Sequence, residues 1–206
     1  MRPLFALCIS LFAAAAPAEY LAPDVQVKTI SDEVIAIVRQ DKDMRAGNQK
    51  KIDELVDAKV LPHFDFGRMT ALAVGRNWTR ASEEQKQALT SEFRTLLVRT
   101  YSSALSTYTN HVIEFRPLRA AVSDAEVTVK TLVKQTGAEA VSIDYSLEKT
   151  PTGWKVYDVV IGGVSLVTNY RETFNAEIRN AGVDGLIKSL AGKNHSSETQ
   201  SSAKAK

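Results

Sequence analysis

Cysteine is the residue that this sequence most conspicuously lacks: Cys8 is the only one among 206 residues. A chain with a single thiol forms no internal disulfide and no multi-thiolate metal site. Because Cys8 lies in an N-terminal segment that we expect to be removed, the mature chain is predicted to have no thiol nucleophile either. Its fold must then be held together by an apolar core alone.

An excess of charge of one sign is also lacking, since 26 Lys and Arg residues oppose 24 Asp and Glu residues. A net charge of +2 is too small to indicate binding to nucleic acid or strong adhesion to anionic membranes. The three histidines are His63, His111 and His195, and none has a histidine or acidic partner at ligand spacing. We therefore predict no metal site.

Motifs for catalysis and cofactor binding are missing as well. No serine lies in a Gly-x-Ser-x-Gly setting, and Gly162-Gly163-Val164-Ser165 lacks both the lysine of a P-loop and the third glycine of a dinucleotide turn. We predict no cofactor and no catalytic residue. Asp65 and Asp158 could serve a small isomerase-like enzyme, but we favour a structural role, with Asp65 capping a helix and Asp158 accepting hydrogen bonds from backbone or an arginine.

The longest hydrophobic run is the thirteen-residue segment from Leu4 to Ala16, which is too short to span a bilayer. It follows Arg2 and ends in Ala16-Pro17-Ala18, the pattern of a cleaved secretory signal peptide. We predict a signal peptide over residues 1–18, one domain over 19–192, and a polar, disordered tail over 193–206. A lipoprotein acylated at Cys8 is the alternative to cleavage after Ala18.

Periodicity predicts helices in the first half of the chain and strands in the second. Apolar residues recur at helical spacing over 24–40, 48–60, 66–75 and 82–108, and again from 165 to 181 with a short helix over 183–190. Ser82 and Gln85 form a capping-box pattern, and Gly75 suits a helix C-terminus. The helix over 82–108 is apolar around roughly half its circumference, so it should contact apolar material on two sides.

Four segments alternate apolar and polar residues as strands do, within HVIEFRPL, AEVTVKTLVK, EAVSIDYSLE and WKVYDVVI. The predicted fold class is therefore α+β, with an antiparallel four-stranded sheet covered by helices on one face. In the last strand both faces are partly apolar, so either Trp154 and Val156 or Tyr157, Val159 and Ile161 could face inward. Gly162-Gly163 is predicted to be a sharp corner, with Ser165 as the N-cap of the next helix.

Several blocks, in this order and spacing, resemble the MlaC, or toluene-tolerance, family, the periplasmic phospholipid-binding component of the Mla lipid-asymmetry system. The resemblance covers nearly all of residues 20 to 190. The blocks are His63-Phe64-Asp65-Phe66 with Gly75 and Trp78; Phe93 through Leu97-Val98-Arg99-Thr100-Tyr101; Gly153-Trp154-Lys155-Val156-Tyr157-Asp158-Val159; and Gly163-Val164-Ser165 through Asn169-Tyr170-Arg171 to Phe174.

This resemblance implies a curved sheet capped by helices, with an apolar pocket that holds phospholipid acyl chains. It also implies shuttling between an outer-membrane lipoprotein–porin complex and an inner-membrane ABC transporter with MCE-domain subunits. The predicted lipid-binding residues are apolar side chains of the strands and later helices: Val74, Trp78, Phe93, Leu97, Tyr101, Leu105, Val127, Val129, Val141, Ile143, Tyr145, Val164, Val167, Tyr170 and Phe174. A carrier of another apolar ligand, such as a hopanoid or an aromatic solvent, is the alternative to the phospholipid carrier.

Overall fold

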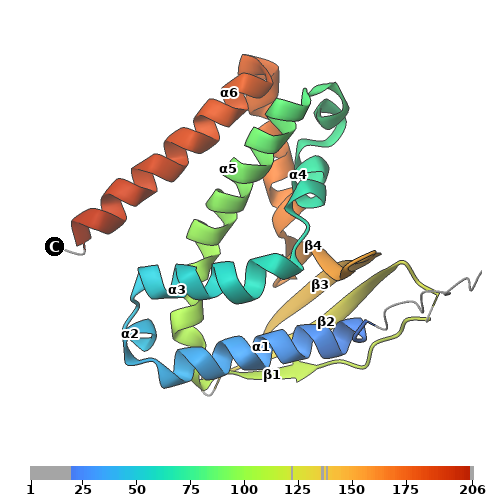
Figure 1. Cartoon of the computed structure of the whole chain (residues 1–206), viewed down its shortest axis with the longest axis vertical. Helices are drawn as coiled ribbons and strands as arrows, with labels where there is room; N and C mark the ends of the chain where they lie inside the picture. Colours follow the sequence, from blue (N-terminus) through green and yellow to red (C-terminus); the bar gives the residue numbers. More distant parts are fainter. Residues whose placement is uncertain (1–19, 122, 136, 138, 205–206) are drawn as a thin grey trace, which may run out of the picture.

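The computed structural model describes residues 20–204 apart from 122, 136 and 138, so the predicted signal peptide lies outside the described residues. Helices cover one face of one antiparallel sheet, which confirms the α+β class (Figure 1). The N-terminal helix α1 (Pro23–Gln40) crosses the sheet, while the long helices α5 (Glu83–Tyr101) and α6 (Leu166–Lys204) stand beside one another above it. The sheet and α1 therefore form one part of the molecule, and the long helices form another.

The first helices begin where local side chains cap them. Asp41 accepts hydrogen bonds from the backbone of α2 (Lys42–Arg45), and Asn48 does the same for α3 (Gln49–Leu55). The segment over 48–60 was predicted as one helix, and the structure keeps its extent but widens the last five residues into the π-helix η1 (Val56–Val60). A 3₁₀ turn, η2 (Leu61–His63), follows and contains Pro62. Such π segments are rare and concentrate at functional sites.

Helix α4 (Phe66–Val74) has the predicted boundaries. The Asp65 carboxylate accepts a hydrogen bond from the Arg68 backbone at 2.8 Å, and Gly75 ends the helix with φ +63°. The 3₁₀ turn η3 (Gly75–Arg80) leads to α5, where Ser82 and Gln85 form the predicted capping box.

The expectation that α5 continues to residue 108 is wrong, because the chain tightens into the 3₁₀ segment η4 (Ser102–Asn110). There the hydroxyls of Ser106 and Thr107 donate to carbonyls three residues earlier. Such side chains compete with the regular helical hydrogen bonds.

The sheet has five strands in sequential order and not the four that we predicted. Its fifth strand is only two residues long, too short to show a period of two in a sequence. Each strand pairs antiparallel with the next, with Val129 opposite Tyr145 and Ile113 opposite Val133. The strands are β1 (Val112–Phe115), β2 (Glu126–Lys134), β3 (Val141–Thr150), β4 (Gly153–Ile161) and β5 (Val164–Ser165).

Helix α6 confirms one expectation and departs from another. The two helices that we predicted to meet near residue 182 are present, because α6 consists of two helical parts separated by a kink at Gly182, whose φ is +71°. We also expected disorder from residue 193, but the helix continues through Lys204 and buries Asn194 against α5. The Asn194 amide donates to the carbonyl and the carboxylate of Glu92, at 3.1 and 2.7 Å. Ala, Lys and Gln are good helix formers, so a helix already anchored by packing extends through a polar sequence.

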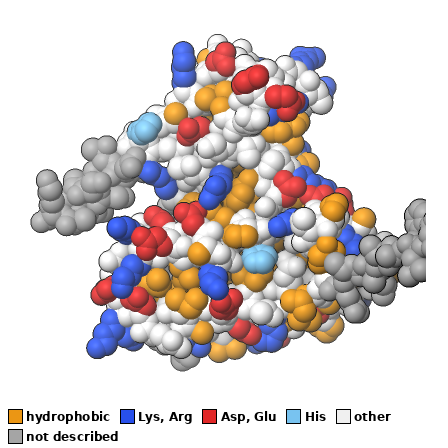
Figure 2. All heavy atoms as spheres, viewed as in Figure 1, with side chains coloured by type: hydrophobic (Ala, Val, Ile, Leu, Met, Phe, Trp, Pro, Cys, Tyr) orange, Lys and Arg blue, Asp and Glu red, His pale blue; other side chains and the backbone are white. Residues whose placement is uncertain are grey.

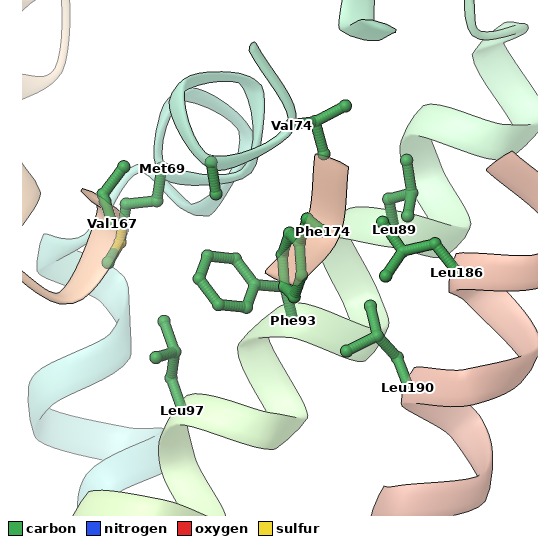
Figure 3. Packing of buried hydrophobic residues seen from close by; sticks show 10 residues of the cluster. Met69, Val74, Leu89, Phe93, Leu97, Val167, Phe174, Leu186 and Leu190 are labelled. Atoms are coloured by element: carbon green, nitrogen blue, oxygen red, sulfur yellow. The ribbon is translucent and has the colours of Figure 1, made fainter. Parts of the chain in front are cut away.

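Three groups of buried side chains make up the core. The helix cluster joins α4, α5 and α6 around Phe93 and Phe174, whose ring centroids are 5.1 Å apart in an edge-to-face arrangement (Figure 3). The sheet cluster joins the inner face of the sheet to Val27 of α1. The N-terminal cluster joins α1, α2, α3 and η1 through Val34, Ile52 and their neighbours. The predicted two-sided contact of α5 is confirmed, because it packs on the helix cluster and also touches the N-terminal cluster through Val98.

Candidate functional site

A cavity of about 300 Å³ lies where the three clusters meet. Its wall takes Leu97 from the helix cluster, Val133 from the sheet cluster and Val34 from the N-terminal cluster, together with their neighbours. This volume is at the lower end of the range of about 300–1,000 Å³ that is typical of small-molecule sites. Because the wall is mostly hydrocarbon, water inside would find few hydrogen-bond partners, and an apolar guest would be favoured.

Five of the predicted binding residues line this cavity. Leu97 and Tyr101 reach it from α5, Leu105 from η4, and Ile143 and Tyr145 from β3. They converge from elements that are far apart in sequence, and the cavity is the place where the long helix and the sheet face one another. Sequence periodicity correctly placed these side chains on inward faces, which is what brings them together here.

The other predicted residues do not line the cavity. Four are buried in the filled helix cluster, with Trp78 and Tyr170 packed beside them: Val74, Phe93, Val167 and Phe174. Val127 and Val129 are buried in the sheet cluster instead. Val141 and Val164 are exposed, at 42% and 55% of their surface. An inward-facing apolar residue can thus lie against other side chains or against the cavity, and its spacing in the sequence is the same in both cases.

Much of the cavity wall comes from residues that the sequence analysis did not select. The apolar stripe of α1 was visible in the sequence, but nothing in its spacing distinguished a cavity from a core. The π-helix η1 presents Val56 and Val60 to the cavity, and no sequence signal marked it. The unselected residues are Gln26, Val27, Ile30, Ser31, Val34, Ile35, Val56, Val60, Leu61, His63, Phe64, Phe66, Met69, Val98, Ser102, Ala104, Ile113, Val133, Val156, Val159, Ile161 and Leu166.

Strand β4 contributes to the wall along both halves because of a β-bulge. Ser146 pairs with Asp158 but the next residue, Leu147, pairs with Val156, so Tyr157 is an extra residue. An extra residue reverses the alternation of side chains. Val156 before the bulge and Val159 after it therefore face the same side and both line the cavity. Of the two sets that the sequence left open, Trp154 and Val156 both face inward, and so do Val159 and Ile161 of the other set. Tyr157 points to the outer face.

The outward-facing Tyr157 belongs to a polar contact that fastens α4 to the sheet. The Arg68 guanidinium lies 3.7 Å from the centre of the Tyr157 ring and forms ion pairs with Glu126 and Glu148. The Tyr157 hydroxyl donates to Glu126 at 3.0 Å. Hydrogen bonds from Arg68 and Tyr157 hold the pKa of Glu126 below its usual value, whereas burial raises the pKa of Tyr157. This contact keeps the start of α4, and with it Phe66, beside the cavity.

Asp65 and Asp158 have the structural roles that we favoured. Asp65 caps α4, and its own backbone N–H donates to the Val156 carbonyl at 2.8 Å. Asp158 accepts from the Ser165 hydroxyl at 2.6 Å and from the Val167 backbone at 3.2 Å. Both carboxylates therefore accept hydrogen bonds from within the protein, and neither lines the cavity.

The corner at Gly162-Gly163 is confirmed. Both glycines have positive φ, +56° and +85°, a conformation that other residues rarely adopt. They turn β4 back onto β5, and Ser165 then caps α6 by accepting a hydrogen bond from the Thr168 backbone at 3.0 Å. The turn joins the wall of the cavity to the helix that carries Phe174.

Polar side chains interrupt the apolar wall at a few places. The Gln26 amide donates to the Trp154 carbonyl at 2.9 Å, and the Ser102 hydroxyl donates to Asp53 at 2.9 Å. Burial raises the pKa of Tyr101, and the neighbouring Tyr170 adds to the effect. Burial lowers the pKa of His63, and the positive charge of Lys155 lowers it further. The cavity-lining residues in the described part of the chain include no carboxylate.

The described residues contain neither a cluster of metal ligands nor a membrane-spanning helix. Over residues 20–204, excluding 122, 136 and 138, no three His, Cys, Asp or Glu side chains gather where they could hold a metal ion. In the same part of the chain, no helix combines the length and the apolar character needed to cross a bilayer. Acidic and basic side chains alternate with hydrophobic ones over the face shown in Figure 2.

Comparison with known families identifies the fold. The model of the family described as "MlaC protein" matches residues 28–192, which is well over half of the chain. The chain belongs to the MlaC family. The resemblance carried by the sequence blocks is therefore confirmed, and with it the curved antiparallel sheet covered by helices.

Curated relatives of this MlaC-family chain are distant in sequence but match over most of their length. The intermembrane phospholipid transport system binding protein MlaC of Haemophilus influenzae is 21% identical over 169 residues, covering 81% of this chain and 79% of that protein. The toluene tolerance protein ttg2D of Pseudomonas putida is 23% identical over 171 residues, covering 82% and 79%.

A solved structure is more similar. It is that of the phospholipid-binding protein from Ralstonia solanacearum in complex with a phospholipid, at 41% identity and a TM-score of 0.79. The match covers 85% of this chain and 98% of that one.

Proposed function

We propose that this MlaC-family protein is a periplasmic carrier that holds the acyl chains of a phospholipid in the cavity between the sheet, α1, η1 and α5. In this role it would shuttle lipid between an outer-membrane lipoprotein–porin complex and an inner-membrane ABC transporter with MCE-domain subunits. The observation that carries the proposal is the apolar cavity itself, in a chain 41% identical to a protein solved with a phospholipid.

The physical chemistry of lipid transfer fits such a cavity. Each CH₂ group of an acyl chain that is exposed to water costs about 0.8 kcal/mol, so lipid crosses an aqueous space only inside an apolar shelter. The wall offers Val, Ile, Leu and Phe side chains from all three clusters. The balanced surface charge also suits a carrier that must leave each membrane after docking.

We further propose that the protein binds lipid without chemically changing it. The two carboxylates that an enzyme could have used are engaged in capping α4 and in closing the β4–β5 turn. Its relatives carry the names of binding and transport proteins. An Asp158→Asn variant that still holds intact lipid would argue against the isomerase-like alternative.

Native mass spectrometry of the protein purified from the periplasm tests the carrier role directly. The parent protein should carry adducts with the masses of phospholipids. Ser31→Trp, which places a large ring in the cavity from α1, should lower lipid occupancy. Thr128→Trp adds the same ring on the exposed face of β2 and should keep the occupancy of the parent. A smaller apolar adduct would favour a carrier of another ligand, and a parent with no adduct would contradict both.

Export is tested by the mass of the mature chain. We propose that residues 1–18 are cleaved, so that the protein begins at Glu19 and retains no cysteine. Intact mass measurement and N-terminal sequencing would establish the first residue. A mature chain that begins at an acylated Cys8 would show instead that the protein is a lipoprotein.

A further inference from the structure

One part of the cavity wall is chemically unlike the rest. His63, in the 3₁₀ turn η2, is half-buried and lines the cavity. Its imidazole makes no hydrogen bond to any of the described residues. By contrast, the polar side chains of Gln26 and Ser102, which line the same cavity, each donate a hydrogen bond to another part of the protein. A ring with two nitrogen atoms, each able to form a hydrogen bond, therefore faces an otherwise apolar space.

Positive charge surrounds this imidazole. The Lys155 ammonium donates at 2.5 Å to the carbonyl of Pro62, which directly precedes His63. Among the described residues this ammonium has no carboxylate partner. Lys59 lies in the preceding π-helix, where it forms an ion pair with Glu33 of α1 at 2.6 Å. Glu33 is close enough to act on the charge state of His63. Two cations and one anion leave a surplus of about one positive charge at this place.

We infer that these three side chains, His63, Lys59 and Lys155, receive the phosphate group of the bound ligand while its acyl chains occupy the cavity. The inference rests on the proposed carrier function and specifies it further, because it states where the lipid lies and which chemical group is recognised. A phosphodiester carries one negative charge and accepts several hydrogen bonds. An imidazole N–H and a lysine ammonium are suitable donors, and charge-assisted bonds of this kind are the stronger ones.

The position of the three residues fits an amphiphilic ligand. Lys59 and His63 lie on the short segment η1–η2, which also presents Val60 and Leu61 to the cavity. Lys155 precedes the wall residue Val156 on β4 and leaves the strand on its other face, but its ammonium extends to the Pro62 carbonyl beside His63. Hydrocarbon-binding and cationic side chains thus alternate over a few residues. A ligand with an apolar part and an adjacent anion matches this order, whereas a purely apolar ligand would offer no anion to the imidazole and the ammonium.

A pair of lipids with the same acyl chains separates recognition of the phosphate from recognition of the chains. The delipidated full mature protein is mixed with vesicles that contain phosphatidylglycerol or diacylglycerol, and the loaded fraction is measured by native mass spectrometry. We expect Lys155→Gln and His63→Leu each to lower phosphatidylglycerol retention roughly tenfold and to leave diacylglycerol retention unchanged. Lys130→Gln is the matched control, because it removes one exposed positive charge from the outer face of the same sheet.

The outcomes distinguish this inference from the carrier function. Equal losses for both lipids would mean that the two residues only shape the wall, and unchanged retention would mean that they do not touch the ligand; either result overturns the inference and leaves the carrier role intact. A parent protein that retains neither lipid overturns the carrier role, and the inference falls with it.

Titration of His63 by NMR gives a second readout that does not depend on the stability of a variant. A phosphate beside the ring should raise the pKa of His63 in the phosphatidylglycerol-loaded protein relative to the diacylglycerol-loaded protein, while Glu33, Lys59 and Lys155 are the same in both. An identical pKa in both samples would overturn the inference. So would the same rise with millimolar inorganic phosphate alone, because the site would then bind free phosphate and not lipid.

Discussion

Helix α5 passes through two regions that differ in one physical respect. In the helix cluster its Phe93 ring packs edge-to-face on Phe174 and Tyr170, at centroid distances of 5.1 and 5.2 Å. Of the buried residues described in this cluster, only Met69 and Leu97 border the cavity. One turn further on, Leu97 and Tyr101 reach the cavity, where the facing residues are mostly Val, Ile and Leu. Large rings meeting in pairs fill the space between helices, whereas shorter side chains on a sheet and a π-helix leave a gap.

The largest expected difference between the two regions comes from a buried charge. Leu186→Asp places a carboxylate in the filled helix cluster, where an unpaired charge costs several kcal/mol, enough to unfold the protein. Ile143→Asp places it on the cavity wall, where the carboxylate reaches water once lipid has left, so the protein should stay folded but empty. Circular dichroism and lipid extraction on the same samples check both variants. Unfolding of both would mean that the cavity behaves as solid core.

Truncation of apolar side chains should show the same contrast between the two regions, with smaller losses in the free energy of unfolding. Phe174→Ala removes a ring from the filled cluster and should lower the free energy of unfolding by about 3–5 kcal/mol, because a new void remains. Leu105→Ala borders a space that is already open, so its cost should be about 1 kcal/mol. Urea denaturation of the lipid-free proteins gives both values. Similar losses for the two variants would contradict the distinction between a filled and a hollow region.

The junction between the regions is the turn at Gly162-Gly163. Gly163→Val forces a β-branched residue to adopt φ +85°, and the loss of stability should be roughly 1–3 kcal/mol, accompanied by weaker lipid retention. The matched control is Gly192→Ala in α6, a position with no positive φ and no close neighbour, where stability should stay the same or rise slightly. Thermal melts and lipid extraction measure both effects. A Gly163→Val protein that melts and binds like the parent would show that the turn tolerates a side chain.

The smallest effect concerns the acid stability of the hollow region. Burial and Lys155 lower the pKa of His63 below its ordinary value of 6.5, so the unfolded chain binds a proton at this residue more readily than the folded chain. Stability of the lipid-free protein should therefore be greatest above about pH 6.5 and fall slightly as the pH decreases toward the lowered pKa. His63→Gln should remove this part of the pH dependence. Melting temperatures measured between pH 5 and 8 for parent and variant test this, and parallel curves would refute it.

The fold was largely predictable because its determinants are local. Alternation on β2, the capping box at Ser82 and the turn glycines each depend on a few neighbouring residues, and all three are confirmed. The exceptions are also local in origin. The change from α to 3₁₀ helix at Ser102, the two-residue strand β5 and the π-helix η1 have weak or very short sequence signatures.

The cavity was predictable only in part because it depends on distances between elements. Phe93 and Leu97 lie one turn apart on the same helix and share the same spacing, yet one is enclosed by rings and the other faces the cavity. Helical periodicity gives the direction in which a side chain points but not what lies opposite. The same limit explains why no residue of α1 was among the predicted lipid-binding residues, although Val27, Ile30 and Val34 all line the cavity.

The extra residue in β4 makes this strand sensitive to its length in a way that its neighbours are not. Residues 154 and 156 are inward, and after Tyr157 the inward positions are 159 and 161, so the two halves of the strand are out of phase. Deleting Tyr157 itself would give the two halves a common phase and leave these four residues inward, so the bulge would be lost without turning either half over. It would also remove the aromatic surface on which Arg68 rests. Deleting any other residue between 154 and 161 would instead turn part of the strand over, so engineering of the cavity should change side chains while preserving the residue count of β4.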